Sequence, residues 1–233
     1  MGRVAAREVA GSRRVEVAPE RVPGWLSRFA VRHGAVTTVA TPDEVVVTAA
    51  DGAVASLQVP FPPLTVDPAS PDRGIAAHVL QPRRVGVLLV RLGGHAVGVF
   101  DGDRLEVSKV GSRQVHGRSA AGGWSQQRFA RRREGQVRVA LAAAADLAAT
   151  LLVPAVPTLD AVVLGGDRRS VDTVLADARL APLRPLVVPP LLDVPDPRKA
   201  VLDSAPARFR AVRITLVDPP TDDMGTRLDS PNG

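Results

Sequence analysis

The sequence contains no cysteine, no tyrosine and few other aromatic residues, which limits both its chemistry and the kind of core it can build. The absence of cysteine excludes disulfides, zinc sites with thiolate ligands, iron–sulfur clusters and a cysteine nucleophile. Aromatic residues make up only 3% of the 233 residues, so we expect a core of Val, Leu and Ala. With 45% hydrophobic and 23% charged residues, the chain has the composition of a globular protein.

Long apolar runs and targeting segments are also missing. The longest apolar stretch, residues 141–156, is interrupted by Asp146 and Pro154, whereas a membrane-spanning helix needs ~20 apolar residues. The first six residues contain neither the apolar segment of a signal peptide nor a myristoylation motif. We therefore expect a cytoplasmic protein with no membrane partner.

Proline and glycine divide the chain into five segments. We expect terminal tails at 1–13 and 218–233, a small α+β module at 14–64, a proline-rich linker at 65–82 and a larger domain at 83–217. Six prolines lie between positions 60 and 82, and we expect this density to block both helix and strand.

Hydrophobic periodicity predicts an α+β fold. The small module is expected to contain a strand at 15–17, a helix at 19–33 and strands at 36–39, 45–48 and 53–59. The larger domain is expected to contain strands at 85–91, 96–100 and 105–110, a helix at 125–152, a strand at 161–164, a helix ending near 178, a strand at 186–188 and a last strand at 208–217. This order is βββαβαβ with one late strand, which predicts a mixed β-sheet with packed helices.

The excess positive charge lies in residues 109–138. This stretch carries eight basic residues and one acidic residue, a net charge of +7, while the rest of the chain carries −1. Seven of the eight are arginines, whose planar guanidinium groups bind phosphates in a bidentate way. Such clustering is typical of nucleic-acid binding, whereas a merely solvated helix face usually has mixed charge. The candidate RNA-binding residues are Lys109, Arg113, His116, Arg118, Arg128, Arg131 and Arg132.

The start of the predicted long helix places amide side chains at a cationic tip. Ser125 is a good N-cap, and Gln126 and Gln127 follow it as the first helical residues. Gly122 and Gly123 precede it and allow close approach of the backbone to a ligand. The helix face that we expect to pack on the sheet is formed by Phe129, Val137, Ala140, Leu141, Ala144, Leu147, Ala148 and Leu151.

These residues resemble a known catalytic loop. His116-Gly117-Arg118, Gly122-Gly123 and Arg128-Phe129-Ala130-Arg131 are similar to the loop of eukaryotic and archaeal class-1 peptide release factors, in which Gly-Gly-Gln precedes an Arg-Phe-Ala-Arg helix. Here Trp124 occupies the position at which that alignment would place the glutamine. The segment Gly123-Trp124-Ser125-Gln126 instead resembles the Gly-x-Ser/Ala-Gln of the Vms-like release factors of ribosome quality control. Their actinobacterial branch consists of short proteins without zinc fingers, in agreement with the absence of cysteine.

The resemblance implies a release-factor catalytic domain with an RNase H-like βββαβαβ order. It also implies a peptidyl-tRNA hydrolase that acts on stalled large ribosomal subunits, with peptidyl-tRNA and ribosomal RNA as partners, no cofactor, and a monomeric state. The implied catalytic residues are Gly122, Gly123, Ser125, Gln126 and Gln127. Because a glutamine amide does not titrate near neutral pH, it would place a water molecule rather than act as a general base. We favour Gln126 over Gln127 for this role.

Other readings of the sequence remain open. A non-catalytic RNA- or ribosome-binding module of the Pelota type would share the charge pattern. A serine hydrolase is a weaker alternative, because Gly123-Trp124-Ser125 lacks the second glycine of a nucleophile elbow. The four histidines are isolated and lack metal-ligand spacing, so we expect no metal site and place all except His116 on the surface or in turns. Gly165-Gly166-Asp167 is interpreted as a tight turn rather than a phosphate site.

Overall fold

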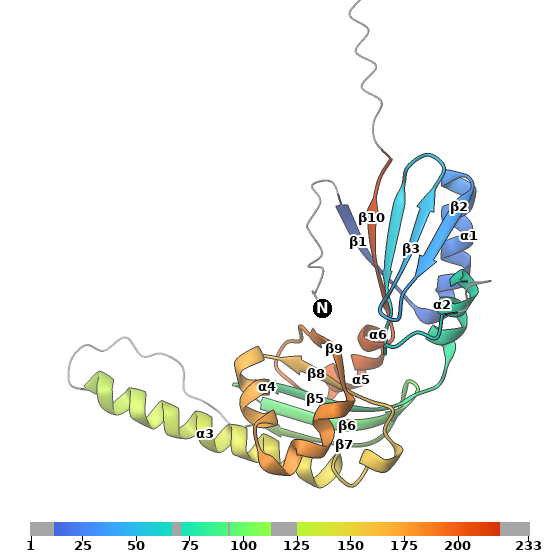
Figure 1. Ribbon diagram of the computed structural model, residues 1–233. Helices are drawn as coiled ribbons and strands as arrows, with labels where there is room; N and C mark the ends of the chain where they lie inside the picture. The colour runs from blue at the N-terminus through green and yellow to red at the C-terminus, as the bar shows by residue number, and fades with distance from the viewer. Residues whose placement is uncertain (1–11, 67–70, 93, 113–124, 220–233) are drawn as a thin grey trace, which may run out of the picture. The chain divides into compact units, whose positions relative to one another are not determined.

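The computed structural model describes residues 12–66, 71–92, 94–112 and 125–219, and these form two compact units (Figure 1). The side chains of residues 71–73, 112 and 125–133 lie outside this description. The first unit comprises the described residues up to Val59, residues 64–76 and the residues from Val212 onward. The second unit comprises residues 60–63 and 77–211.

The first unit is a five-stranded antiparallel sheet with one long helix. Its elements are β1 (Ser12–Val17), the 3₁₀ helix η1 (Pro19–Arg21), α1 (Val22–His33), β2 (Val36–Ala40), β3 (Glu44–Ala49), β4 (Val54–Gln58) and β10 (Val212–Val217). The strand order is β1-β10-β4-β3-β2. Successive side chains alternate between the two faces of the sheet, so Val45, Leu57 and Ile214 are buried on one face. Helix α1 lies against this face and buries Phe29 there (Figure 1).

The second unit is a mixed sheet with helices on both faces. Its elements are α2 (Pro71–Leu80, which begins in the first unit), β5 (Arg84–Arg91), β6 (Gly94–Asp101), β7 (Arg104–Ser112), α3 (Ser125–Leu151), η2 (Val156–Thr158), β8 (Ala161–Gly166), α4 (Arg168–Leu175), η3 (Ala178–Leu186), β9 (Val187–Leu192), α5 (Lys199–Asp203) and α6 (Ala205–Phe209). The strand order is β7-β6-β5-β8-β9. The pairs β5–β8 and β8–β9 are parallel, and the pairs β5–β6 and β6–β7 are antiparallel.

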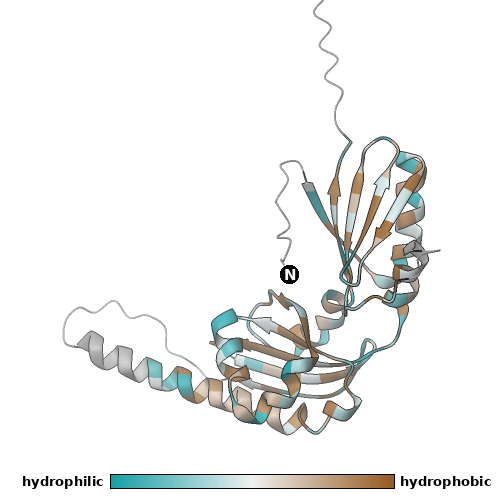
Figure 2. Cartoon of the chain, in the orientation of Figure 1, coloured by the Kyte–Doolittle hydropathy of each residue, from teal (hydrophilic) through white to brown (hydrophobic). Residues whose placement is uncertain are grey.

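Burial on both faces explains the continuous apolar sequence of β5, which is coloured brown along most of its length in Figure 2. On one face, Leu88 and Val90 join a core formed with α3, α4 and η3. On the other face, Val85, Val87 and Leu89 join a second core formed with α5 and α6. The order β5-β6-β7-α3-β8-α4-β9 confirms the predicted α+β class and the βββαβαβ order.

The last strand belongs to a different sheet from the one predicted. The strand predicted at 208–217 as part of the larger domain is β10, and it pairs with β1 and β4 in the sheet of the first unit. Its burial alternates strictly, with Ile214 and Leu216 buried and Arg213 and Thr215 half-buried. This pattern suits a sheet with one solvated face, whereas the central strands of the second unit are buried on both faces.

The proline-rich segment also differs from its prediction, because residues 65–82 do not lack regular structure. Helix α2 occupies Pro71–Leu80 and buries Ile75 and Val79. Pro71 is the first residue of the helix, where a proline costs nothing because its missing N–H would have no partner within the helix.

Near the C-terminal end of α2, the second unit holds a buried histidine, His78. The Nε2 atom of His78 donates a hydrogen bond to the carbonyl of Pro60 at 2.8 Å, and Nδ1 lies 3.3 Å from Nη2 of Arg83. Burial lowers the pKa of His78 below its usual value of 6.5, and the charge of Arg83 lowers it further, although the hydrogen bond to Pro60 acts in the opposite direction. Protonation of His78 would place a second positive charge next to Arg83.

We predict that acidification destabilises the protein through His78. Because the pKa of this group is lower in the folded than in the unfolded chain, its contribution is fully present above about pH 6.5 and is lost as the pH falls through and below that value. In chemical denaturation, His78→Gln should therefore be less stable than the wild type at about pH 8, and the difference in free energy of unfolding should shrink towards about pH 5. A difference that stays constant or grows on acidification would contradict this prediction.

Candidate functional site

Helix α3 carries half of the predicted site residues, and its C-terminal part is buried in the second unit. Of its residues from 134 onward, whose side chains are described, Ala144 and Ala145 are the first buried ones, and residues 134–143 are exposed or half-buried. At a rise of about 1.5 Å per residue, Ser125 lies roughly 28 Å along the helix axis from Ala144. Figure 1 shows the first turns of α3 beyond the edge of the sheet. The backbone of the helix start therefore lies away from the sheet of the second unit.

Small residues anchor the packed end of α3. Ala144, Ala145 and Ala148 are at most 3% exposed and belong to the core that also contains Leu88 of β5 and Val97 of β6. Because alanine projects little beyond the backbone, these positions let the helix lie close to the sheet. The predicted apolar face is confirmed over its C-terminal half, where Leu141, Leu147 and Leu151 pack partly buried against this core.

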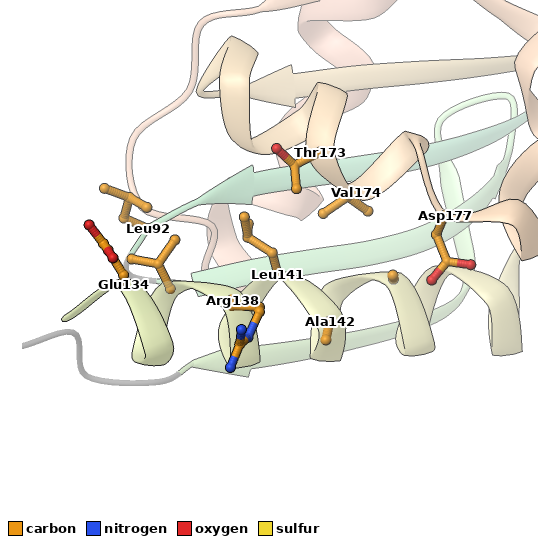
Figure 3. Close-up of a pocket in the computed structure, with 10 residues that line it drawn as sticks. Leu92, Glu134, Arg138, Leu141, Ala142, Thr173, Val174 and Asp177 are labelled. Carbon is orange, nitrogen blue, oxygen red and sulfur yellow. The ribbon is translucent and has the colours of Figure 1, made fainter. Parts of the chain in front are cut away.

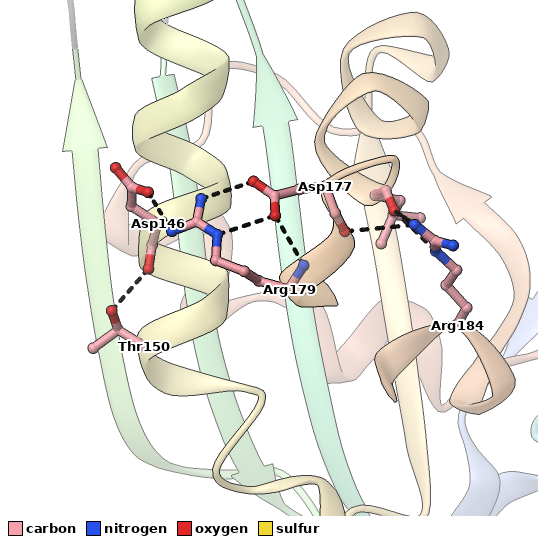
Figure 4. A network of polar contacts seen from close by, with 6 residues as sticks. Asp146, Thr150, Asp177, Arg179 and Arg184 are labelled. Atoms are coloured by element: carbon pink, nitrogen blue, oxygen red, sulfur yellow. Dashed lines mark hydrogen bonds and ion pairs between the residues drawn. The ribbon is translucent and has the colours of Figure 1, made fainter. Parts of the chain in front are cut away.

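A polar network ties the same part of α3 to η3 (Figure 4). Nη1 of Arg179 lies 2.8 Å from Oδ1 of Asp146 on α3, and its Nη2 and Nε lie 2.7 and 3.0 Å from the two carboxylate oxygens of Asp177. Hydrogen bonds from the side chain and the backbone N–H of Arg179 lower the pKa of Asp177 to about 2. The two carboxylates raise the pKa of Arg179, Asp177 more than Asp146. The pair of Asp177 and Arg179 therefore stays charged over the physiological pH range, and the contact of Arg179 with Asp146 links helix α3 to η3.

A groove with a volume of about 800 Å³ lies where α3 leaves the body of the unit, between α3 and α4 (Figure 3). It is lined mainly by apolar side chains, including Leu92, Leu141 and Val174, with Glu134 and Arg138 on its α3 side. Among the described residues, the lining contains no histidine or serine. We therefore do not assign the chemistry of the site to this groove.

Strand β7 ends where the basic segment begins. Lys109 pairs with Val97, which places it on the sheet face covered by α3, and its side chain is exposed. Two residues further, Gly111 pairs with the buried His95. A Cβ atom on Gly111 would lie 2.3 Å from Nε2 of His95, so this position has no room for a side chain. The His95 ring thus fills the space beside Gly111, near the C-terminal end of β7.

The predicted site residues fall into three groups. Lys109 is described completely. Helix α3 starts at Ser125, as predicted, and contains Gln126, Gln127, Arg128, Arg131 and Arg132 within its first turns, although their side chains lie outside the described part of the chain. Arg113, His116, Arg118, Gly122 and Gly123 lie outside the described residues.

The backbone at the start of α3 has a defined electrostatic character. The first four N–H groups of a helix have no partner within it, and together they form the positive end of the helix dipole. The first turn contains no acidic residue, and Glu134 is the first acidic residue of the helix. Residues 125–133 also contain no histidine. An anionic ligand would therefore be favoured here, and the helix start itself supplies no general base.

The carboxylates that could suggest a nuclease have structural partners instead. Asp160 accepts the backbone N–H of Arg84 at 2.7 Å, and Glu106 pairs with the side chain of Arg84 at 2.7 Å. Asp167 caps α4 by accepting the N–H of Ser170 at 2.9 Å. Gly166 has a φ of +106°, and a Cβ on it would lie 2.0 Å from the Val90 carbonyl oxygen. These contacts agree with the interpretation of this segment as a tight turn.

The histidines differ in part from their predicted positions. His78 and His95 are each only 7% exposed, so the expectation of surface or turn positions is wrong for both. Within the described ranges, no group of three or more His, Asp or Glu side chains could hold a metal ion. Among the helices that the structure describes, none combines the length and apolar character needed to cross a membrane.

Sequence reasoning did not single out a second basic cluster, in the first unit. Arg13 of β1 and Arg28 and Arg32 of α1 line one hollow together with Trp25. The helical spacing of Trp25, Arg28 and Arg32 was a signal in the sequence. The contribution of Arg13 depends on the pairing of β1 with β10, which local patterns do not reveal.

Comparisons with known proteins give a family and a set of similar structures. The sequence model of the family described as "Actinobacteria/chloroflexi VLRF1 release factor" matches residues 83–215, more than half of the chain. "Crystal structure of archaeal translation termination factor, aRF1" is similar with a TM-score of 0.41 and 17% identity, and the match covers 70% of this chain and 51% of that chain. A second solved structure, "Archaeal protein", matches with the same values. The chain thus spans about half the length of these structures, and no curated protein matches it.

We predict that Gly135→Ala stabilises the projecting part of α3. Gly135 lies inside the helix, and a Cβ atom there would meet no described atom within 4 Å. Replacing glycine by alanine in an open helix interior stabilises it by about 1 kcal/mol. Hydrogen exchange should show greater protection of α3 amides, whereas Gly111→Ala, which would crowd His95, should lower stability. Unchanged or weaker protection in Gly135→Ala would contradict a continuous helix through this position.

Proposed function

Because the chain belongs to the family of actinobacterial and chloroflexi VLRF1 release factors, we propose that it releases nascent peptides from tRNA on the large ribosomal subunit. The reaction is hydrolysis of the ester between the peptide and the terminal ribose of peptidyl-tRNA. Water adds to the ester carbonyl carbon, the bond to the ribose oxygen breaks, and that oxygen takes up the proton.

The observation that carries this proposal is the projection of α3. The peptidyl-tRNA ester lies in a confined centre made of RNA, which a compact protein body cannot enter. A single helix about 10 Å wide that extends roughly 28 Å beyond its anchor can enter such a centre. The helix start then meets the ester first, and Gln126 and Gln127 are the residues located there.

Glutamine at this position constrains the mechanism. Its amide has no pKa near neutral pH, so Gln126 can orient a water molecule but cannot remove its proton. Correct placement of reactants lowers a barrier substantially, because it removes the entropic cost of bringing them together. Proton transfer and stabilisation of the oxyanion then fall to the tRNA ribose and the ribosomal RNA. Hydrolysis should therefore depend on the ribosome.

The charge of the same helix supports RNA as the surrounding partner. Residues 125–133 contain four arginines and no acidic residue. Among the described residues, Lys109 and Arg138 form no ion pair within the second unit, so both are available to phosphates. Arginine binds phosphate oxygens through two parallel N–H groups, and this contact holds the helix along a nucleic-acid backbone.

We predict that Gln126→Ala lowers peptide release on stalled ribosome–nascent-chain complexes by on the order of a hundredfold, because the water is no longer oriented. Release of a labelled peptide measures this effect. Gln127→Ala tests the neighbouring amide, and Gln136→Ala, nearly three turns further along α3 than Gln126, should release as fast as the wild type. If all three variants release at the wild-type rate, the assignment of the water-placing residue is wrong. If neither wild type nor variants release peptide although they bind, a Pelota-type binding module is favoured.

We also predict that Arg131→Ala combined with Arg132→Ala weakens binding to large subunits at moderate salt. Each lost phosphate contact should lower the slope of log affinity against log salt by about 0.7 for single-stranded and about 0.9 for duplex RNA. Filter binding over a salt series provides the measurement. Replacing the exposed Arg168 and Arg169 of α4 by alanine removes the same charge and should leave the slope unchanged. Equal slopes for both double variants would argue against phosphate contacts at the start of α3.

A further inference from the structure

The first unit contains a hollow that combines arginines with stacked aromatic rings. It has a volume of about 350 Å³ and lies on the sheet face covered by α1. Its lining includes Arg13, Trp25, Arg28, Phe29, Arg32 and His33. Three arginines and a tryptophan in one small hollow are unusual in a chain that has only two tryptophans.

Helical spacing brings four of these side chains together. Trp25, Arg28, Phe29 and Arg32 lie three, four and seven residues apart, so they follow one face of α1. Phe29 is buried, Trp25 is half-buried, and both arginines are exposed. This face therefore packs through Phe29 and presents the polar ends of its neighbours at the edge of the contact with the sheet.

Strand pairing adds the third arginine. Arg13 of β1 lies opposite Leu216 of β10, and Leu216 points to the buried face of the sheet. Arg13 therefore lies on the same side of the sheet as α1, although its side chain is exposed because β1 is an edge strand. Its neighbour Arg14 lies on the opposite face, since successive residues of a strand alternate.

The aromatic rings form a fixed stack. The rings of Trp25 and Phe29 are 5.5 Å apart and nearly parallel, at 14°. The ring of His33 follows at 4.7 Å from Phe29, and its Nδ1 lies 2.8 Å from Oδ2 of Asp51. Asp51 also accepts the backbone N–H of Ala53 at 2.9 Å, and this bond and the contact with His33 lower its pKa. The turn between β3 and β4 thus holds the stack in place from one end.

The arginines of the hollow have no acceptor within the described part of the first unit. No hydrogen bond or ion pair involves the side chains of Arg13, Arg28 or Arg32 there. The guanidinium group of Arg28 lies close to Gly24. A Cβ atom on Gly24 would be 3.3 Å from Nη1 of Arg28, so the glycine leaves room for this side chain. Among the described residues of the lining, Asp218 is the one acidic residue. Within this described part, the hollow therefore has more positive than negative charge, and its arginine N–H groups have no protein acceptor.

The opposite face of the same sheet carries a different set of charges. A second hollow there is lined by Arg14 and Arg213 together with Glu16, Asp43 and Glu44. Arg213 pairs with Glu16 at 3.2 Å. Charges of both signs lie together on this face. The printed lining on the α1 side instead carries three arginines and one carboxylate.

We infer that the hollow of the first unit binds single-stranded RNA, with an unpaired base stacked on Trp25 and the flanking phosphates on Arg13, Arg28 and Arg32. Aromatic rings that stack with bases, set among arginines that bind the backbone, are the combination that single-stranded nucleic acids require. An acidic peptide would satisfy the arginines but would gain nothing from the stack. An anionic membrane would need apolar side chains inserted into it, whereas the rings here stack on one another.

Fluorescence of Trp25 tests this inference in the full-length chain. Trp124→Phe leaves Trp25 as the sole tryptophan, so its emission reports on this hollow alone. A single-stranded RNA of about twelve nucleotides, within the range of known site sizes, should quench it on binding. Large subunits and free tRNA, added in separate titrations, identify which RNA supplies the unpaired base. RNA binding detected by anisotropy without any quenching of Trp25 would overturn the inference.

A pair of neighbouring arginines provides a matched control. Arg13→Ala should weaken RNA binding and lower the salt slope by about 0.7, the value for one phosphate contact in single-stranded RNA. Arg14→Ala removes the same charge from the same strand on the other face and should change neither quantity. Equal effects of Arg13→Ala and Arg14→Ala would mean that only the overall charge matters, and this result would contradict a defined site.

Substitution of the aromatic residue separates stacking from charge. Trp25→Ala should weaken binding of a labelled RNA by about five- to a hundredfold, and Trp25→Phe should keep most of the affinity because it keeps a ring for the base. Thermal unfolding shows whether either variant is folded. If polyglutamate or vesicles with anionic lipids quench Trp25 as well as RNA does and with the same salt slope, the hollow is a general anion site and the inference is wrong.

Peptide release distinguishes this inference from the proposed function. Arg28→Ala combined with Arg32→Ala should bind large subunits less tightly and yet release peptide at the wild-type rate when the protein is saturating. Gln126→Ala should bind normally and fail to release. Normal RNA binding by the Arg28/Arg32 variant would refute the RNA site and leave the hydrolysis untouched. Wild-type release by both Gln126→Ala and Gln127→Ala would contradict the proposed placement of water and leave the RNA site untouched.

Discussion

Close packing of a few alanines on the sheet is the constraint on which the second unit depends. Helix α3 is fixed near Ala144, Ala145 and Ala148, and its first turns lie beyond the edge of the sheet (Figure 1). A change of about 5° in the direction of the helix at the anchor moves Ser125 by roughly 2.5 Å, since the lever is roughly 28 Å long. A displacement of this size is enough to spoil the orientation of a reacting water. In the proposed reaction, the anchor alone would therefore not set the position of Gln126, and contacts with RNA along the helix would have to complete the alignment.

The first unit is built from distant parts of the chain. Strand β10 lies between β1 and β4, so β1 has no neighbour in this sheet until the chain has passed through the whole second unit. Residues 14–64 alone would leave Ile214 and Leu216 out of the core and expose the edge of β4. The second unit is thus inserted into the first. This arrangement makes the hollow near α1 dependent on residues at both ends of the sequence.

Local patterns predicted the elements well and the long-range pairing poorly. The alternation in β3 and β4 and the apolar run of β5 each specify their environment within a few residues, and all three strands lie where they were predicted. The pairing of β10 is not a local property, because its alternating sequence fits any half-exposed sheet. The start of α3 at Ser125 was predictable from its cap and the apolar face that follows. The hollow lined by Arg13 was not predictable from local patterns, because Arg13 reaches the residues of α1 only through the pairing of β1 with β10.

The two proposed RNA contacts would have different tasks, and the chemistry explains why both are useful. A neutral amide contributes only orientation to hydrolysis, so the protein cannot compensate for loose binding with a strong acid or base. Binding energy from parts of a complex that do not react can hold the reacting groups in place. The stack of Trp25 and Phe29, with arginines that have no acceptor among the described residues, would supply such energy from a unit that contains none of the proposed catalytic residues. The arginines on α3, next to Gln126, would then mainly guide the helix start rather than provide the affinity. On this view, weakening the hollow changes how much protein is needed, whereas weakening the helix start changes how fast each bound molecule acts.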